Sequence, residues 1–227
     1  MKAVLFDLFG TLVDNMTNAQ VEQFRHDVAD SLKVEREEFK HGWSATFPQR
    51  AAGNWSTAEM IAAAADLCSA KYSSAGLERA VAIRREFMRR WLTPQPDAFS
   101  TLRELKQRGF RIGLLSNCSS EVPELWPSLE FAFVIEIPLF SCREWLRKPM
   151  PEFFLRALER LEVAPPECLY VADGDSGELA SATALGMPAM MIRNGEDEFR
   201  IDSEEWDGPR IERLSELLQH ESLQLCL

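Results

Sequence analysis

Residues 3–12 read Ala3-Val4-Leu5-Phe6-Asp7-Leu8-Phe9-Gly10-Thr11-Leu12, and this stretch decides the fold that the sequence predicts. Its four leading apolar residues are typical of a buried strand, and Gly10 indicates a turn shortly after it. Asp7 would therefore stand at the carboxyl end of the strand, where open α/β sheets carry their functional groups. A carboxylate placed there can act as a covalent nucleophile or a metal ligand, although an aspartate that only caps a turn has the same pattern.

Three later segments have the same form, because each places polar residues after an apolar run or before a helical pattern. They are Ile112–Leu115 followed by Ser116 and Asn117, Arg147-Lys148-Pro149 before the helical pattern at 151–161, and Cys168–Val171 followed by Asp173, Asp175 and Glu178. Because parallel strands end at one edge of a sheet, we expect these polar groups to meet near Asp7.

In this order and at these spacings, the four segments resemble those of the haloacid dehalogenase superfamily of aspartyl-nucleophile hydrolases. The resemblance runs from Val4 to about Ile192, and the fourth segment continues into 182–187 as it does in members of the family. It implies an α/β fold with a Rossmann-like, three-layer core around a parallel sheet, plus an all-helical cap domain. The core would comprise residues 1–14 and 94–227, and the cap, which would govern substrate choice, residues 15–93.

The pattern of apolar residues agrees with this architecture. Strand-like runs at 3–6, 111–115, 132–135, 168–172 and 189–192 alternate with helical patterns, which include 97–108 and 151–161. The segment between Asp14 and Thr93 is helical throughout by pattern. It contains an apolar stripe at Val21, Phe24, Val28 and Leu32, a capping-box pattern at 56–59, and a further helix over 77–91.

Bulk composition agrees with one soluble enzyme of modest size. The chain has 227 residues, of which 46% are apolar, and a formal net charge of −11. This charge is opposite to the basic surface that binding to nucleic acid or to an anionic membrane requires, so we expect neither partner. We expect a cytoplasmic protein, monomeric or homodimeric, that takes a small anionic molecule as substrate. Five cysteines without CxxC spacing favour reduced thiols over a disulfide or zinc framework.

The resemblance implies roles for the residues that would surround the substrate. Asp7 would attack the electrophilic atom of the substrate and form an acyl intermediate, most often an aspartyl phosphate, that water then cleaves. Ser116 would hydrogen-bond a phosphoryl oxygen, and Asn117 would help to shape the pocket. Lys148 would pair with Asp7 and with the transferring group, which keeps the carboxylate ionised and offsets charge in the transition state.

The resemblance also implies a metal site. Asp7, the backbone carbonyl of Phe9 and Asp173 would hold Mg²⁺, a hard cation that prefers oxygen ligands. Glu178 would orient Lys148 or a water molecule at the metal, and Asp175 would support the site from behind it.

Phe9 departs from the phosphatase pattern of this family. Phosphatases ordinarily carry a second aspartate two residues after the nucleophile, where it protonates the leaving oxygen and then activates water. Phe9 can do neither, and positioned acid–base catalysis is typically worth about 10²–10⁴-fold in rate. The sequence therefore predicts poor catalysis on alkyl phosphates.

Three explanations of Phe9 remain open. The first is a phosphatase whose substrate has a good leaving group, or whose general acid comes from elsewhere, including the cap. The second is a 2-haloacid dehalogenase, because those relatives also place an aromatic residue here and expel halide, which needs no proton. They work without metal, however, and have a non-acidic residue at the position of Asp173, so we rank phosphoryl chemistry first. The third is a weakly active or non-catalytic binding protein.

The cap offers fewer signals about the substrate. Segments 41–43 and 47–55 are candidates to face the pocket, with Arg50 as an anion-binding residue and Trp43 or Trp55 as a stacking surface. An ordinary aromatic core and a solvated arginine would give the same pattern. Four further arginines, Arg84, Arg85, Arg89 and Arg90, are expected to form a solvated helix face.

Overall fold

The computed structural model describes residues 1–53, 55–68, 71–193, 199 and 205–223. In these ranges six parallel strands form one sheet in the order β3-β2-β1-β4-β5-β6. They are β1 (Ala3–Phe6), β2 (Arg111–Ser116), β3 (Ile137–Phe140), β4 (Cys168–Ala172), β5 (Ala189–Ile192) and β6 (Arg210–Ile211). The strand order reverses direction at β1, between β2 and β4, and such a switch point is where ligands bind in open α/β sheets.

Helices cover both faces of the sheet. Alternate residues of β1 enter different cores: Val4 and Phe6 pack with Leu102 of α6 (Ala98–Gln107), whereas Ala3 and Leu5 pack with α9 (Pro151–Leu161) and α10 (Glu178–Ala184). The shorter helices are α7 (Glu121–Leu125), α8 (Ser141–Glu144) and 3₁₀ turns at Trp126–Ser128, Pro165–Glu167, Leu214–Gln219 and Glu221–Leu223. The result is the three-layer, Rossmann-like α/β fold that the sequence predicts.

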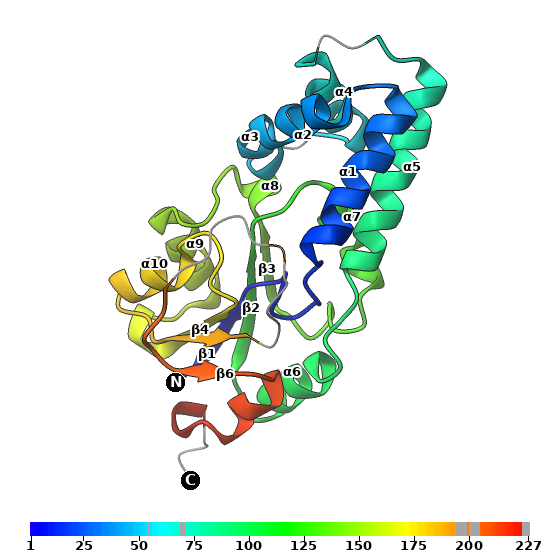
Figure 1. Ribbon diagram of the computed structural model, residues 1–227. Helices are drawn as coiled ribbons and strands as arrows, with labels where there is room; N and C mark the ends of the chain where they lie inside the picture. The colour runs from blue at the N-terminus through cyan, green and yellow to red at the C-terminus, as the bar shows by residue number, and fades with distance from the viewer. Residues whose placement is uncertain (54, 69–70, 194–198, 200–204, 224–227) are drawn as a thin grey trace.

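Five helices between β1 and α6 form a separate group, which we call the helical segment. They are α1 (Asn18–Leu32), α2 (Arg36–Ala45), α3 (Phe47–Ala51), α4 (Thr57–Asp66) and α5 (Ser74–Trp91). Their apolar sides share a core of their own, to which α1 contributes Phe24, Val28 and Leu32. Figure 1 shows the segment standing beyond one end of the sheet, with α3 next to α8 and α5 next to α7.

Local signals fix the ends of several helices. Ser56 accepts a hydrogen bond from the Glu59 amide while the Glu59 carboxylate accepts one from the Ser56 amide, which is the capping box that the sequence predicts. The predicted helix at 151–161 matches α9 residue for residue, and Pro151 stands at its first position, where the missing N–H costs nothing. Helix α6 ends before Gly109, whose φ of +88° continues the chain in the left-handed region.

The predicted strand at 132–135 is wrong. These residues form a turn, in which the Val134 amide donates to the Phe131 carbonyl, and β3 begins later, at Ile137. Pro138 argues against a strand by sequence because it lacks an N–H, but β3 is an edge strand and needs hydrogen bonds on one side only. Phe131 and Val134 are buried nonetheless, which explains the apolar run.

No helix in the described ranges is long and apolar enough to cross a membrane. Four of the cysteines, Cys68, Cys118, Cys142 and Cys168, are free thiols, and Cys226 lies outside the described residues.

Candidate active site

Asp7 lies at the carboxyl edge of the sheet, between the ends of its two neighbouring strands. Phe6 pairs in register with Leu114 of β2 and Val171 of β4, and the Asp7 amide continues the ladder with a 3.0 Å hydrogen bond to the Val171 carbonyl. The Asp7 side chain is buried and accepts a hydrogen bond of 3.4 Å from the Thr11 hydroxyl. Because Asp7 directly follows the last paired residue of β1, the length of the apolar run at 3–6 determines where the Asp7 side chain lies.

Lys148 brings a positive charge to this carboxylate. Its Nζ donates to Asp7 Oδ1 and, over 2.6 Å, to Glu178 Oε2, and the side chain is buried with both partners. Burial alone would lower the pKa of Lys148, but the negative charges of Asp7 and Glu178 outweigh it and raise the pKa above its usual value. Lys148 is therefore a stable ammonium at neutral pH.

Asn117 positions the Lys148 backbone. Its amide Nδ2 donates to the Lys148 carbonyl over 3.0 Å, and its Oδ1 accepts from the Lys148 amide over 2.8 Å. Asn117 also lines the cavity described below, so it shapes the pocket from a fixed position. Ser116, the last residue of β2, is fully buried, and its hydroxyl has no hydrogen-bond partner among the described residues.

The loop after β4 adds further acidic groups. Asp173 is buried, and its Oδ1 accepts from the Asp175 amide over 3.1 Å. Glu178 is fully buried at the start of α10, where its Oε2 also accepts a 2.6 Å hydrogen bond from the Tyr170 hydroxyl. Carboxylate oxygens of Asp7, Asp173 and Glu178 all lie within 4.8 Å of one another.

These carboxylates destabilise one another's charges. Burial raises the pKa of Glu178 well above its usual value, and the charges of Asp7 and Asp173 raise it further against the opposing charge of Lys148. One ammonium does not balance three buried carboxylates, and their oxygens are hard donors of the kind that Mg²⁺ prefers. The donor set therefore fits a divalent cation.

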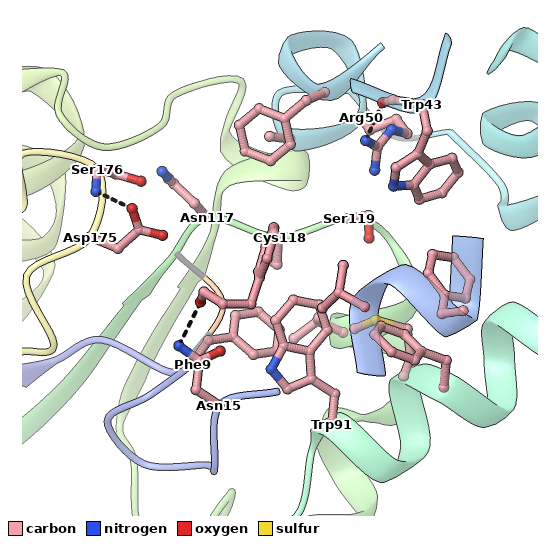
Figure 2. A pocket seen from close by; sticks show the side chains of 18 of the residues that line it. Phe9, Asn15, Trp43, Arg50, Trp91, Asn117, Cys118, Ser119, Asp175 and Ser176 are labelled. Carbon is pink, nitrogen blue, oxygen red and sulfur yellow. Dashed lines mark hydrogen bonds between the residues drawn. The ribbon is translucent and has the colours of Figure 1, made fainter. Parts of the chain in front are cut away.

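A cavity of about 390 Å³ opens above this cluster and lies between the sheet edge and the helical segment. Phe9 lines it and packs against Trp91 of α5, with ring centroids 4.6 Å apart. Phe87 and Phe24 continue the aromatic lining, with centroids 4.4 Å apart. Figure 2 shows Phe9 and Trp91 together along one side of the cavity, and Trp43 and Arg50 on another.

The helical segment supplies arginines to the cavity in a way that the sequence only partly predicts. Arg50 lines it as expected and is buried, whereas Trp55 does not line it, and Asn54 lies outside the described residues. The expectation of a solvated face is wrong for Arg84, which is buried and paired with Glu121. The signal for Arg84 is its spacing, because it falls four residues from both Ala80 and Met88 on the buried stripe of α5.

Comparison with known proteins places this arrangement among hydrolases. Residues 1–186 match the family model of the haloacid dehalogenase-like hydrolases. A glyceraldehyde 3-phosphate phosphatase from Methanopyrus kandleri is 31% identical over 134 residues, a match that spans only 56% of this chain and 56% of that protein. An (S)-2-haloacid dehalogenase from a Pseudomonas species is 27% identical over 207 residues, which are 85% of this chain and 84% of that protein.

Solved structures show the same fold. A haloacid dehalogenase family enzyme from Bacteroides thetaiotaomicron, in complex with magnesium and inorganic phosphate, aligns with a TM-score of 0.67 at 20% identity. The alignment covers 87% of this chain and 96% of that one.

Proposed function

This chain belongs to the haloacid dehalogenase-like hydrolases, and from that premise we propose that it is a Mg²⁺-dependent phosphatase acting on a small phosphorylated metabolite. The buried cluster of Asp7, Asp173 and Glu178 is the observation that carries the proposal. A phosphoryl group brings further negative charge to these carboxylates, and a divalent cation relieves that repulsion most simply. The similarity to a phosphatase and to a family structure with magnesium and phosphate supports the same assignment.

In this proposal Asp7, Asp173 and the backbone carbonyl of Phe9 hold Mg²⁺. The ion supplies charge neutralisation for the phosphoryl oxygens. Glu178 is committed to Lys148 and Tyr170, so we assign it the task of holding the ammonium in place.

The side chains around Asp7 then divide the work of phosphoryl transfer. An Asp7 oxygen attacks phosphorus and forms the aspartyl phosphate as the bond from phosphorus to the leaving oxygen breaks, and water then cleaves this intermediate into inorganic phosphate and free Asp7. Lys148, held by Glu178 and by the Asn117 amide, offsets the charge on the transferring group. In this proposal the Ser116 hydroxyl, which is fully buried and has no hydrogen-bond partner among the described residues, donates to a phosphoryl oxygen, although Ser116 is not among the residues that line the cavity. Asp175, which orders the loop by donating its amide to Asp173, supports the metal site.

The leaving group follows from what lines the cavity. Phe9 has no proton to give, and the residues of the helical segment that line the cavity, within the described ranges, include no aspartate or glutamate. The helical segment, residues 15–93, acts in this proposal as the cap that selects the substrate, but it does not supply a carboxylic acid. We therefore propose a substrate with a good leaving group, such as an acyl or aryl phosphate.

A 2-haloacid dehalogenase is the second candidate. The aromatic contact of Phe9 with Trp91 favours it, because halide leaves without a proton and such a wall excludes water. The acidic Asp173 speaks against it, because a carboxylate beside Asp7 repels an anionic haloacid in the absence of a metal.

Activity assays separate the two candidates. We expect the purified protein to hydrolyse acetyl phosphate or p-nitrophenyl phosphate with Mg²⁺ and to lose this activity with chelator. Asp7→Asn should abolish turnover without unfolding the protein, and Asp27→Asn, an exposed change of the same kind on α1, should not. Halide release from 2-chloropropionate that chelator does not affect would establish the dehalogenase instead. An absence of turnover on all these substrates would favour a binding protein.

A further inference from the structure

Three arginines of the helical segment line the cavity, and they differ in what neutralises them. Arg25 pairs with Glu22 over 3.0 Å, and Arg84 pairs with Glu121 over 3.0 Å. Arg50 has no carboxylate within 4.0 Å among the residues that the structure describes. Of these three, it is the buried cation that forms no ion pair in the described part of the chain.

The guanidinium of Arg50 is held rigidly at the cavity wall. Its Nε donates to the Thr46 hydroxyl over 3.2 Å, and one terminal nitrogen donates to the Trp43 carbonyl over 2.7 Å. The same group lies over the Trp43 ring, 3.7 Å from its centroid. A guanidinium has five N–H donors, so these two bonds leave a face of the fork available to a ligand. Figure 2 shows Arg50 beside Trp43, across the view from Asp175 and Asn117.

The position of Arg50 is electrostatically unfavourable without an anion. Arg50 is only 6% exposed. Burial and then the positive charge of Arg84 lower the pKa of Arg50 to about 9, and the negative charge of Glu121 offsets them only in part. A buried charge normally persists in a protein because it is paired, and an anionic ligand group would provide the missing partner.

One side of the cavity is aromatic. Phe9, Phe87 and Trp91 form a continuous aromatic contact there, with ring centroids 4.6 Å and 5.4 Å apart. Such a wall binds hydrocarbon or ring surface and repels further charge. The cavity thus has the carboxylate cluster at the sheet edge, an aromatic side, and buried arginines on the helical segment.

We propose that the substrate carries two anionic groups joined by an apolar or aromatic body, with the phosphoryl group at Asp7 and a second anion, carboxylate or phosphate, bound by Arg50. This inference rests on the proposed phosphatase function and names the class of its substrate. The second anion would bind through charge-assisted hydrogen bonds to the guanidinium fork, with Trp43 stacked behind it.

Binding of non-hydrolysable probes tests this inference apart from catalysis. Calorimetric titration in Mg²⁺ would compare phenylphosphonate, which has one anionic group, with 3- and 4-phosphonobenzoate and with benzene-1,4-diphosphonate. The phosphonobenzoates carry a carboxylate as their second anionic group, and the diphosphonate carries a second phosphonate. Comparison of the two kinds of probe therefore shows which second anion binds more tightly. We expect at least one probe with two anionic groups to bind the wild-type protein about 10-fold or more tightly than phenylphosphonate, which has one.

Variants assign the preference to Arg50. Arg50→Gln should remove it, and Arg50→Lys, which keeps the charge but not the fork, should retain part of it. Arg85→Gln is the matched control, because Arg85 is an exposed arginine of α5 that does not line the cavity. Circular dichroism verifies that each variant is folded, and if Arg50→Gln does not fold, Arg50→Lys carries the comparison.

The outcomes separate this inference from the proposed function. Equal binding of all probes to the wild type overturns the inference even if the protein hydrolyses phenyl phosphate, and so does a preference that both Arg50 variants retain. Loss of affinity for all probes alike in the Arg50 variants would give Arg50 a purely structural role and would also overturn it. Selective binding of the probes with two anionic groups, without hydrolysis of the matching phosphate esters, would instead refute the phosphatase assignment.

Discussion

Arg84 of α5 donates a 3.0 Å hydrogen bond to the carboxylate of Glu121 on α7, and the side chains of both residues are buried. The Arg84 guanidinium also donates to the Ser119 hydroxyl over 3.2 Å. The pair joins the helical segment to the loop and helix that follow β2, next to Asn117. Since Asn117 holds Lys148, this ion pair connects the helical segment to the side of the cavity on which Lys148 and Asp7 lie.

Removal of one partner of this pair should destabilise the protein strongly. Glu121→Gln would leave the Arg84 charge buried without a counter-charge, which typically costs about 3–5 kcal/mol in the free energy of unfolding. Urea denaturation measures the change. The matched control is Glu86→Gln, which breaks exposed ion pairs with Arg89 and Arg90 and should have little effect. If both variants lose the same amount of free energy of unfolding, the buried pair stabilises the protein no more than the exposed pairs do.

The same pair should make stability depend on acid. Burial alone would raise the pKa of Glu121, but the charge of Arg84 together with the hydrogen bonds that the carboxylate accepts outweighs burial and holds the pKa below its usual value of 4.5. The folded state then releases this proton at lower pH than the unfolded state, so the pair stabilises the protein at neutral pH and stops doing so as pH falls below about 4.5 through the lower folded value. In urea titrations the stability gap between wild type and Glu121→Gln should shrink on acidification. A gap that stays constant from pH 7 to pH 3 would contradict this assignment.

The sequence predicts the placement of the candidate residues well where local patterns determine it. An apolar run of fixed length ends before Asp7, Ser116 and Asp173, and parallel pairing at equal register brings these three ends to one edge. Local signals also determine helix α9, because Pro151 starts it and the spacing of its apolar residues continues to Leu161.

Features that depend on distant partners are not predicted. Arg84 looks like a solvated arginine until Glu121, 37 residues later, is known to face it. The tie between Glu178 and Tyr170 is a similar case, since nothing in a strand pattern marks one tyrosine as a buried donor. The strand predicted at 132–135 is wrong because an apolar run reports burial, and here it belongs to a buried turn that precedes β3.

Mg²⁺ should raise the melting temperature if the carboxylate cluster binds it. A ligand that binds only the folded state adds about 2.7 kcal/mol at 100 times its Kd. Asp173→Asn removes one buried carboxylate of the cluster and should abolish the Mg²⁺-dependent shift, whereas Asp27→Asn, which is exposed on α1, should keep it. Differential scanning fluorimetry with Mg²⁺ and with chelator measures both shifts. An equal shift in Asp173→Asn would place the ion elsewhere.

Gly10 should be intolerant of a side chain for two separable reasons. Its φ is +69°, and a Cβ built there would lie 2.6 Å from Asp173 Oδ2. Gly109 has a φ of +88° but no atom within 4 Å of such a Cβ. Both alanine variants therefore bear the left-handed backbone cost of about 1–2 kcal/mol, but only Gly10→Ala displaces the Asp173 carboxylate. We expect Gly10→Ala to lose phosphatase activity and the Mg²⁺-dependent thermal shift, and Gly109→Ala to lose neither. Retention of both properties by Gly10→Ala would show that Asp173 can move without consequence.

Phe9→Asp should change which phosphates the protein hydrolyses. An acid at this position could protonate a leaving alkoxide, a contribution of up to about 10²–10⁴-fold. It would act on glycerol phosphate and hardly on p-nitrophenyl phosphate, whose leaving group needs no proton. The ratio of kcat/KM for glycerol phosphate to kcat/KM for p-nitrophenyl phosphate should therefore rise. The melting temperature should fall, because the ring contact with Trp91 at 4.6 Å is lost. Phe9→Leu controls for that loss, since it removes the ring without adding an acid and should leave the ratio near its wild-type value. An unchanged ratio in a folded Phe9→Asp protein would mean that a proton already reaches the leaving group from another source.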